Sequence, residues 1–127
     1  MSHLVKIELE IKEMIPLEKA CKRLGLTMKK NQQTFKWYGR EDASCDHAIS
    51  IPGAKYEIGV SQNRATKNYE LQTDFWDKGV AAKIGVNGGL LKQAYTVEKA
   101  KWEATKKGYS CREIQTAKGI QLRITVQ

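Results

Sequence analysis

Residues 5–25 read VKIELEIKEMIPLEKACKRLG, a segment with two different periods. In its first part apolar residues alternate with charged ones, and this period of two predicts a strand with one buried face. In its second part Pro16 begins a pattern of apolar residues at helical spacing, and Gly25 ends it. A half-buried strand followed by an amphipathic helix is typical of a sheet that helices cover on one side.

The rest of the chain continues with the same two patterns. Four strand-like segments lie between turn residues: Thr34 to Tyr38, His47 to Ile51, Lys55 to Val60 and Tyr69 to Trp76. Residues 88–107 again have helical spacing, and alternation returns from Ile120 to Val126 after a strand-like segment from Ser110 to Thr116. Short connections between successive strands favour antiparallel pairing.

These elements predict an α+β fold in the order β-α-β-β-β-β-α-β-β. We expect a mostly antiparallel sheet with two helices packed on one face, and with Leu122 and Ile124 of the last strand in the core. The 127 residues are enough for one domain, which we place at 1–127.

The cysteines and the apolar runs of the sequence indicate in which compartment we expect the protein to act. The cysteines Cys21, Cys45 and Cys111 are odd in number and lack CxxC spacing, so we expect free thiols and not a disulfide framework or a zinc site. No apolar run has the length of a signal peptide or a membrane span, and we therefore expect a cytoplasmic protein that does not enter membranes.

The formal charge of +8 is unevenly distributed along the sequence. Residues 17–40 carry seven bases and one acid, and residues 78–112 carry eight bases and two acids. Residues 41–77 carry three bases and seven acids. A basic excess of this kind favours acidic partners, although ordinary solvated lysines produce it as well.

Several short motifs resemble one known family. They are Met1-Ser2-His3, Tyr38-Gly39 with Asp46, Tyr56-Glu57-Ile58-Gly59, Tyr69-Glu70-Leu71, Asp74-Phe75-Trp76, and Leu91-Lys92-Gln93-Ala94-Tyr95 with Gly108-Tyr109. In these positions the chain resembles domain-of-unknown-function family 1257 of cyanobacteria, algal plastids and cyanophage. The resemblance implies homology over nearly the whole chain, and a setting in the cytosol or stroma of a photosynthetic cell or of a phage-infected one. The family has two adjacent tryptophans where this chain has Phe75-Trp76, and glycine in place of Asp77.

Exposed aromatic residues are the first candidates for partner binding. Strand alternation places Phe75 inward and Trp76 outward beside Asp74, and Tyr38 alternates away from Trp37. We take Trp76, Asp74 and Tyr38 as the candidates, since exposed aromatics anchor interfaces. The alternatives are that Asp74 only bonds its own turn and that Trp76 folds over its strand end.

Two weaker candidates concern ions. Asn87, Gly88 and Gly89 precede the long helix, whose N-terminal N–H groups favour anions, although Asn87 as an N-cap explains the same residues. His3 and His47 could share a divalent metal if their strands are neighbours. Otherwise they are ordinary edge or core histidines, and we assign neither a metal nor a cofactor.

Basic residues recur on both helices. Lys92, Lys99 and Lys106 are spaced every seven residues, and we expect them to lie opposite the apolar arc of the long helix. Lys19, Lys22 and Arg23 point away from the apolar face of the first helix and could merge with them into one basic surface, or remain a solvated face. Glu98 and Lys101 fall inside the apolar arc, and we expect them to pair at its edge; the alternative is that this face meets something polar.

The residues favour binding over catalysis. The leading hypothesis is a non-enzymatic accessory or adaptor domain that binds a partner protein or a second copy of itself, without a cofactor. The alternative is nucleic-acid binding through the basic helical face, and an enzyme of unknown reaction comes third.

Overall fold

The computed structural model describes residues 4–126, with only the backbone of Glu41 described. Its centre is a five-stranded antiparallel sheet in the order β1-β7-β6-β5-β2. These strands are β1 (Val5–Ile11), β2 (Thr27–Lys30), β5 (His47–Ser50), β6 (Ile58–Gln62) and β7 (Tyr69–Thr73).

Two hairpins and four helical segments complete the described chain. The hairpins are β3 (Thr34–Trp37) with β4 (Arg40–Ser44), and β8 (Ser110–Thr116) with β9 (Gly119–Thr125). The helices are α1 (Met14–Arg23), α2 (Lys78–Ile84), the 3-10 helix η1 (Val86–Gly88) and α3 (Gly89–Lys106).

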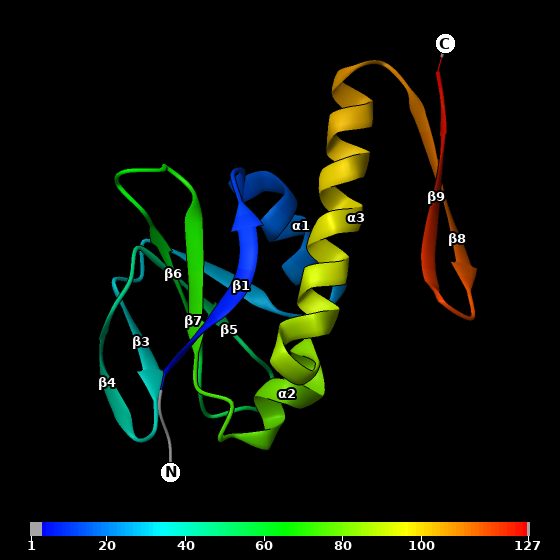
Figure 1. Ribbon diagram of the computed structural model, residues 1–127. Coiled ribbons are helices and arrows are strands. Elements are labelled where there is room, and N and C mark those ends of the chain that lie inside the picture. Colours follow the sequence, from blue (N-terminus) through cyan, green and yellow to red (C-terminus); the bar gives the residue numbers. More distant parts are fainter. Residues whose placement is uncertain (1–3, 127) are drawn as a thin grey trace.

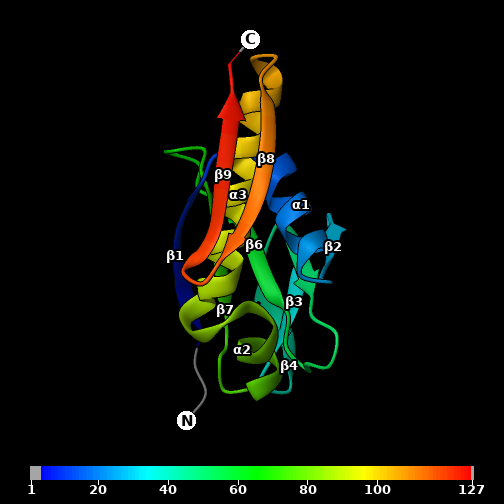
Figure 2. The same ribbon diagram turned by 90° about the vertical axis from the view of Figure 1, so that its right-hand side faces the viewer.

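These elements form successive layers. Figure 1 shows the β3–β4 hairpin, the sheet, the helices α1 and α3, and the β8–β9 hairpin following one another across the molecule, and Figure 2 shows the β8–β9 hairpin in front of α3. Both long helices lie on the same face of the sheet. The expected α+β fold, a mostly antiparallel sheet with two helices on one face, is confirmed.

The segment from β1 to Gly25 folds as its periods predict. Ile7 and Ile11 of β1 are buried, whereas the alternate charged residues are exposed. Helix α1 ends in a Schellman motif, in which Gly25 at φ 76° donates its N–H to the Lys22 carbonyl and Leu26 donates to the Cys21 carbonyl. Glycine suits this position because its left-handed backbone is strained for other residues.

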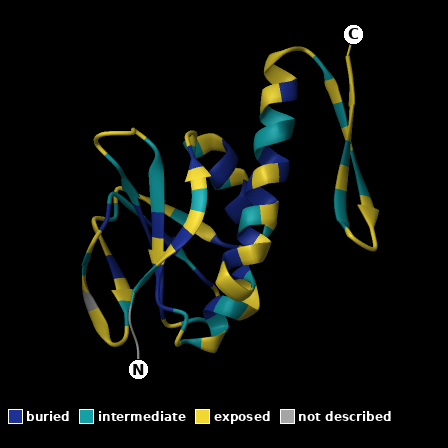
Figure 3. Cartoon of the chain, viewed as in Figure 1, coloured by how far each residue is buried: buried dark blue, intermediate teal, exposed yellow. Residues whose placement is uncertain are grey.

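The main core lies between the sheet and the helices. Leu17 and Ala20 of α1, and Leu91 and Tyr95 of α3, pack into one cluster with the inward side chains of the strands. These strand residues include Ile7, Ile11, Ile49, Ile58, Val60 and Leu71. Figure 3 shows the buried positions concentrated there, while β8 and β9 carry only intermediate and exposed ones.

The expectation that the last strand belongs to this sheet is wrong. Strand β9 pairs with β8, and α3 lies between this hairpin and the sheet (Figure 1). Leu122 is therefore half-buried, and Ile124 is 44% exposed. Alternation along β9 indicates that one face is covered, but it carries no information about whether a sheet or a single helix covers it.

Two strands have no counterpart in the sequence-based prediction. Strands β2 and β4 read TMKK and REDAS, and neither alternates between apolar and polar residues. Within residues 4–126, no helix is long and apolar enough to cross a membrane.

Candidate functional site

A groove lies where β1, the end of β7 and the start of α3 meet, and we call it the β1 groove. It has a volume of about 530 Å³. It is lined by Val5, Lys6, Ile7, Glu8, Asp74, Phe75, Trp76, Asn87 and Lys92. Candidates that the sequence suggested for three separate reasons, Trp76 with Asp74, Asn87 and Lys92, therefore converge on one cavity.

The turn after β7 orients the aromatic side chains. Asp74 is only 1% exposed, and its carboxylate accepts a hydrogen bond of 2.9 Å from the backbone N–H of Trp76. This Asx turn directs Phe75 toward the core and leaves Trp76 60% exposed, as the alternation predicted. The expectation that Asp74 lies outward with Trp76 is therefore wrong: it is buried, because its carboxylate bonds the backbone of its own turn.

Asp77 performs a second structural task in the same turn. Its carboxylate caps α2 by accepting a hydrogen bond of 2.9 Å from the Gly79 N–H. It also accepts a hydrogen bond of 2.6 Å from the Lys55 N–H. Burial raises the pKa of Asp77, but the backbone N–H groups of Lys55, Gly79 and Tyr56 outweigh it and hold the pKa below its usual value. Asp77 is therefore ionised near neutral pH and is occupied by the backbone.

Strand β1 forms the other wall and one edge of the sheet. It pairs with β7 on one side, and among the described strands none pairs with its outer side. Lys6 Nζ lies 3.0 Å from Glu70 on β7. The hydrogen bond and the opposite charge raise the pKa of Lys6 and lower the pKa of Glu70. Glu8 and Lys92 add one acid and one base to the groove.

The approach to α3 differs from the expected helix cap. Asn87 adopts a left-handed backbone inside η1, and the N-cap of α3 is Gly88, so the interpretation of Asn87 as N-cap is wrong. Gly88 is buried against β1, where an added Cβ would lie 3.0 Å from Ile7 Cγ2. The Asn87-Gly88-Gly89 segment thus brings the helix close to β1, and the exposed Asn87 lines the groove.

Tyr38 lies in a different cavity, between the β3–β4 hairpin and Lys55 and Tyr56. It is 57% exposed, but it does not share a surface pocket with Trp76. His47 lies on β5, where its Nδ1 accepts a hydrogen bond from the Asn31 N–H at 3.0 Å. His3, its proposed metal partner, lies outside the described residues. In the described part of the chain, no three His, Cys, Asp or Glu side chains form a group that could hold a metal ion.

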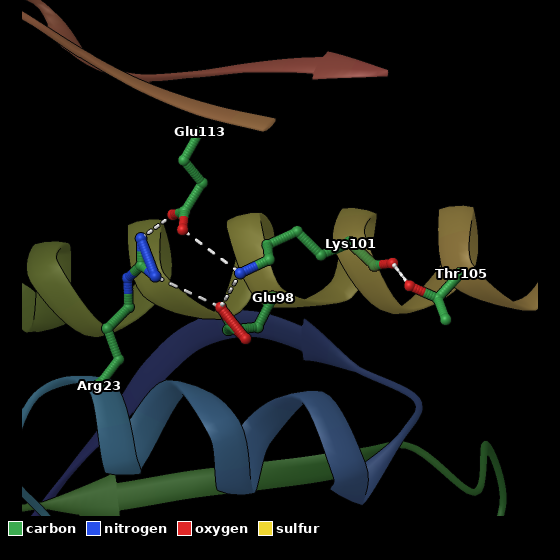
Figure 4. Close-up of polar contacts among 5 residues, drawn as sticks. All are labelled: Arg23, Glu98, Lys101, Thr105 and Glu113. Carbon is green, nitrogen blue, oxygen red and sulfur yellow. Dashed lines mark hydrogen bonds and ion pairs between the residues drawn. The ribbon is translucent and has the colours of Figure 1, made fainter. Parts of the chain in front are cut away.

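The six basic helix residues do not form one free surface. Figure 4 shows Arg23 reaching from α1 to Glu98 on α3 and to Glu113 on β8. Lys101 lies 3.6 Å from Glu98, which confirms the expected pair, and 3.3 Å from Glu113. This charge cluster fastens the C-terminal hairpin to both helices, and it occupies Arg23.

The lysine stripe of α3 lies at the edge of the buried arc and not opposite to it. Lys92 and Lys99 are both partly buried, and Lys92 lines the β1 groove. Lys106 Nζ lies 4.1 Å from the centre of the Trp102 ring. Lys19 and Lys22 remain exposed on α1. The helical geometry thus separates Lys92 from Arg23, which contacts another side of α3.

Chemically, the β1 groove is suited to binding. It offers an exposed indole, apolar strand side chains and both signs of charge. The two buried thiols lie elsewhere, and burial raises the pKa of Cys21 to about 12 and of Cys45 to about 11. They are protonated near neutral pH and are poor nucleophiles. Sequence reasoning missed the β1 residues of the groove, because only the pairing of β1 with β7 brings them beside Trp76.

Comparison with known proteins identifies one family. A family model described as "Protein of unknown function (DUF1257)" matches residues 20–125. No curated protein matches the chain, and no solved structure matches it.

Proposed function

Since the chain belongs to the DUF1257 family of proteins of unknown function, we propose from its geometry that it is a non-enzymatic accessory domain that binds a partner protein. The binding site is the β1 groove, and its ligand is an extended segment of the partner. The domain acts in the cytoplasm, where its buried thiols stay reduced.

The exposure of Trp76 at the rim of the groove carries this proposal. Trp76 is 60% exposed and leaves a large apolar surface in water, whereas its neighbour Phe75 is half-buried. Tryptophan is among the residues that dominate interface energies, most of all when polar residues surround it. Lys6, Glu8 and Lys92 provide that surround.

The open edge of β1 supports an extended ligand. A peptide that adds to a sheet edge gains main-chain hydrogen bonds, and side-chain pockets beside the edge give specificity. The register of β1 with β7 is regular from Val5 to Ile7 and becomes irregular before Ile11. The regular part is the part that lines the groove, so a partner strand would pair there and place an apolar side chain against Trp76.

Affinity capture from cyanobacterial lysate tests the proposal when wild type, Trp76→Ala and a matched control are compared. Ile15→Ala is the control, since Ile15 is an apolar residue 48% exposed on α1 and outside the groove. We expect partner proteins that survive nuclease treatment, bind wild type and Ile15→Ala equally, and are lost with Trp76→Ala. Light scattering of the same variants shows whether the partner is a second copy of the chain.

The segment of the captured partner that binds is then prepared as a peptide, and calorimetry measures the affinity of this peptide for the protein. Removal of a tryptophan anchor should weaken binding by about 2 kcal/mol or more. Equal affinity for wild type and Trp76→Ala would remove the β1 groove as the binding site.

A further inference from the structure

A second cavity, which we call the Tyr38 pocket, lies beside the β3–β4 hairpin. Its volume is about 710 Å³, and it is lined by Lys36, Trp37, Tyr38, Gly39, Arg40, Lys55 and Tyr56. Three of these residues are aromatic, three are basic, and none is acidic. We propose that this pocket binds a nucleotide unit, an aromatic base with its phosphate, either free or within a single strand of nucleic acid.

The backbone of Tyr38 is the first observation. Tyr38 and Gly39 form the two-residue turn between β3 and β4, and both have positive φ, at 43° and 69°. Turns of this geometry favour Asn or Gly at the first position, and a bulky residue there is strained. Strain that persists at an exposed side chain points to a function for that side chain. Here it places a phenol ring, 57% exposed, at the mouth of a basic cavity.

The arrangement of cations is the second observation. The Arg40 guanidinium lies 5.5 Å from the centre of the Trp37 ring and 3.1 Å from Asp42, and the side chains of Arg40 and Asp42 are 58% and 62% exposed. An ion pair so exposed is weak, and a phosphate can compete for the guanidinium. Lys55 reaches the same pocket from the segment between β5 and β6. The backbone N–H of Lys55 donates to Asp77, which fixes the backbone there.

Stacking surface next to cations is the chemistry that recognises nucleotides. A base stacks on an exposed aromatic ring, and the attached phosphate accepts hydrogen bonds from arginine and lysine. A duplex keeps its bases stacked on one another, so the pocket should prefer a single strand. The Tyr38 pocket shares no lining residue with the β1 groove, and the inference therefore stands apart from the proposed protein partner.

Fluorescence anisotropy tests the inference with three labelled probes: ten-nucleotide oligothymidylate, the matching duplex and ten-residue polyglutamate. Thymidine monophosphate serves as the competitor. We expect tightest binding of the single strand. Tyr38→Gly should weaken it about 5- to 150-fold, since each stacked base contributes on this scale, whereas Tyr38→Phe should stay within about twofold. Arg40→Gln and Lys55→Gln should each reduce the salt slope by about 0.7.

The controls separate the pocket from general charge and from unfolding. Arg112→Gln removes an exposed base on β8 outside the Tyr38 pocket, and it should bind as wild type does. Tyr38→Gly relieves the positive φ, so its thermal midpoint should be unchanged or higher. Competition by the monophosphate at the affinity of the strand would assign a free nucleotide, and a weaker monophosphate would assign a strand.

Any of four results overturns the inference. They are no binding at low salt, equal binding of Tyr38→Gly and wild type, equal loss with Arg112→Gln and Arg40→Gln, and binding of the duplex or of polyglutamate as tight as that of the single strand.

Discussion

Gly59 lies in β6 directly beneath the ring of Phe35, which the β3–β4 hairpin places on the outer face of the sheet. A Cβ added at Gly59 would lie only 2.3 Å from the nearest ring atom of Phe35. The glycine is thus required for close packing and not for an unusual backbone. Phe35, Cys45 and Ala48 form a small second core at this contact.

Gly59→Ala should therefore destabilise the protein by about 1–3 kcal/mol, the usual range for overpacking. Urea unfolding followed by tryptophan fluorescence measures the change. Gly89→Ala is the matched control, because an added Cβ there meets no atom within 4 Å and its backbone is helical. If both substitutions left stability unchanged, the ring of Phe35 would not lie where the structure places it.

Asp77 links stability to pH. Its folded pKa lies below its unfolded value of about 3.8, so it stabilises the fold above that pH and loses this effect as the pH falls. Asp77→Ala should be less stable than wild type by about 0.5–2 kcal/mol at pH 7, the range for a lost N-cap. The difference should shrink as the pH falls through 4 and below. Parallel urea titrations at pH 7 and pH 3 measure it, with Asp77→Asn as the uncharged cap, and a difference independent of pH would contradict the role of the charge.

At the scale of elements, the C-terminal hairpin is the least covered part of the described fold. Its apolar face, with Ile120, Leu122 and Ile124, turns toward α3, and Glu113 on the same face joins the charge cluster with Arg23 and Lys101 (Figure 4). A two-stranded hairpin is marginally stable without such support. Its outer face carries Arg112 directly opposite Arg123, a like-charged pair that weakens the hairpin further.

Glu113→Gln should loosen the hairpin selectively. The substitution leaves Arg23 and Lys101 with Glu98 as their remaining acid in the cluster, and removes the ionic contact of β8 with the helices. Hydrogen exchange should become faster in residues 110–125 and stay unchanged in the five-stranded sheet. Glu103→Gln, the same charge change at an exposed position of α3, is the control. Uniform acceleration across the chain would indicate that the cluster supports the whole fold.

The sequence predicted which strands and helices form better than it predicted which of them lie side by side. Alternation in β1 and helical spacing in α1 identified both elements, since burial of one face imposes a period on the residues. The short polar strands β2 and β4 have no such period, because no described residue of either strand is buried. Trp76, Asn87 and Lys92 were found one by one, but their convergence depends on the β1–β7 pairing and on Gly88, which local pattern does not specify.

At the scale of the whole molecule, several acidic side chains of residues 41–77 are engaged by the backbone. Four acids of the middle segment accept hydrogen bonds from backbone N–H groups: Asp46 from Gln62, Glu57 from Lys36, Asp74 from Trp76, and Asp77 from Lys55 and Gly79. Their charges therefore serve the fold, and Glu57 and Asp74 are buried. A net charge of +8 favours the approach of acidic ligands from a distance.

The layered arrangement also predicts that the C-terminal hairpin is dispensable for folding. The buried residues of both core clusters lie between Ile7 and Tyr95, and none comes from β8 or β9. The C-terminal cap of α3 does not depend on the hairpin, since Gly108 donates its N–H to the Thr105 carbonyl and Tyr109 donates to the Ala104 carbonyl. A chain that stops after Tyr109 keeps this cap and both cavities of the proposed sites.

We expect residues 1–109 to unfold cooperatively at a lower temperature than the full chain, because the half-buried Ile120 and Leu122 no longer cover α3. The near-ultraviolet circular dichroism of Trp37, Trp76 and Trp102 and a thermal melt measure this. A chain ending at Leu90 is the comparison, since it lacks the core residues Leu91, Ala94 and Tyr95 and should not fold. If the 1–109 chain also lost its tertiary signal, the hairpin would contribute to the core through contacts that its exposure does not reveal, and the layered account of stability would be wrong.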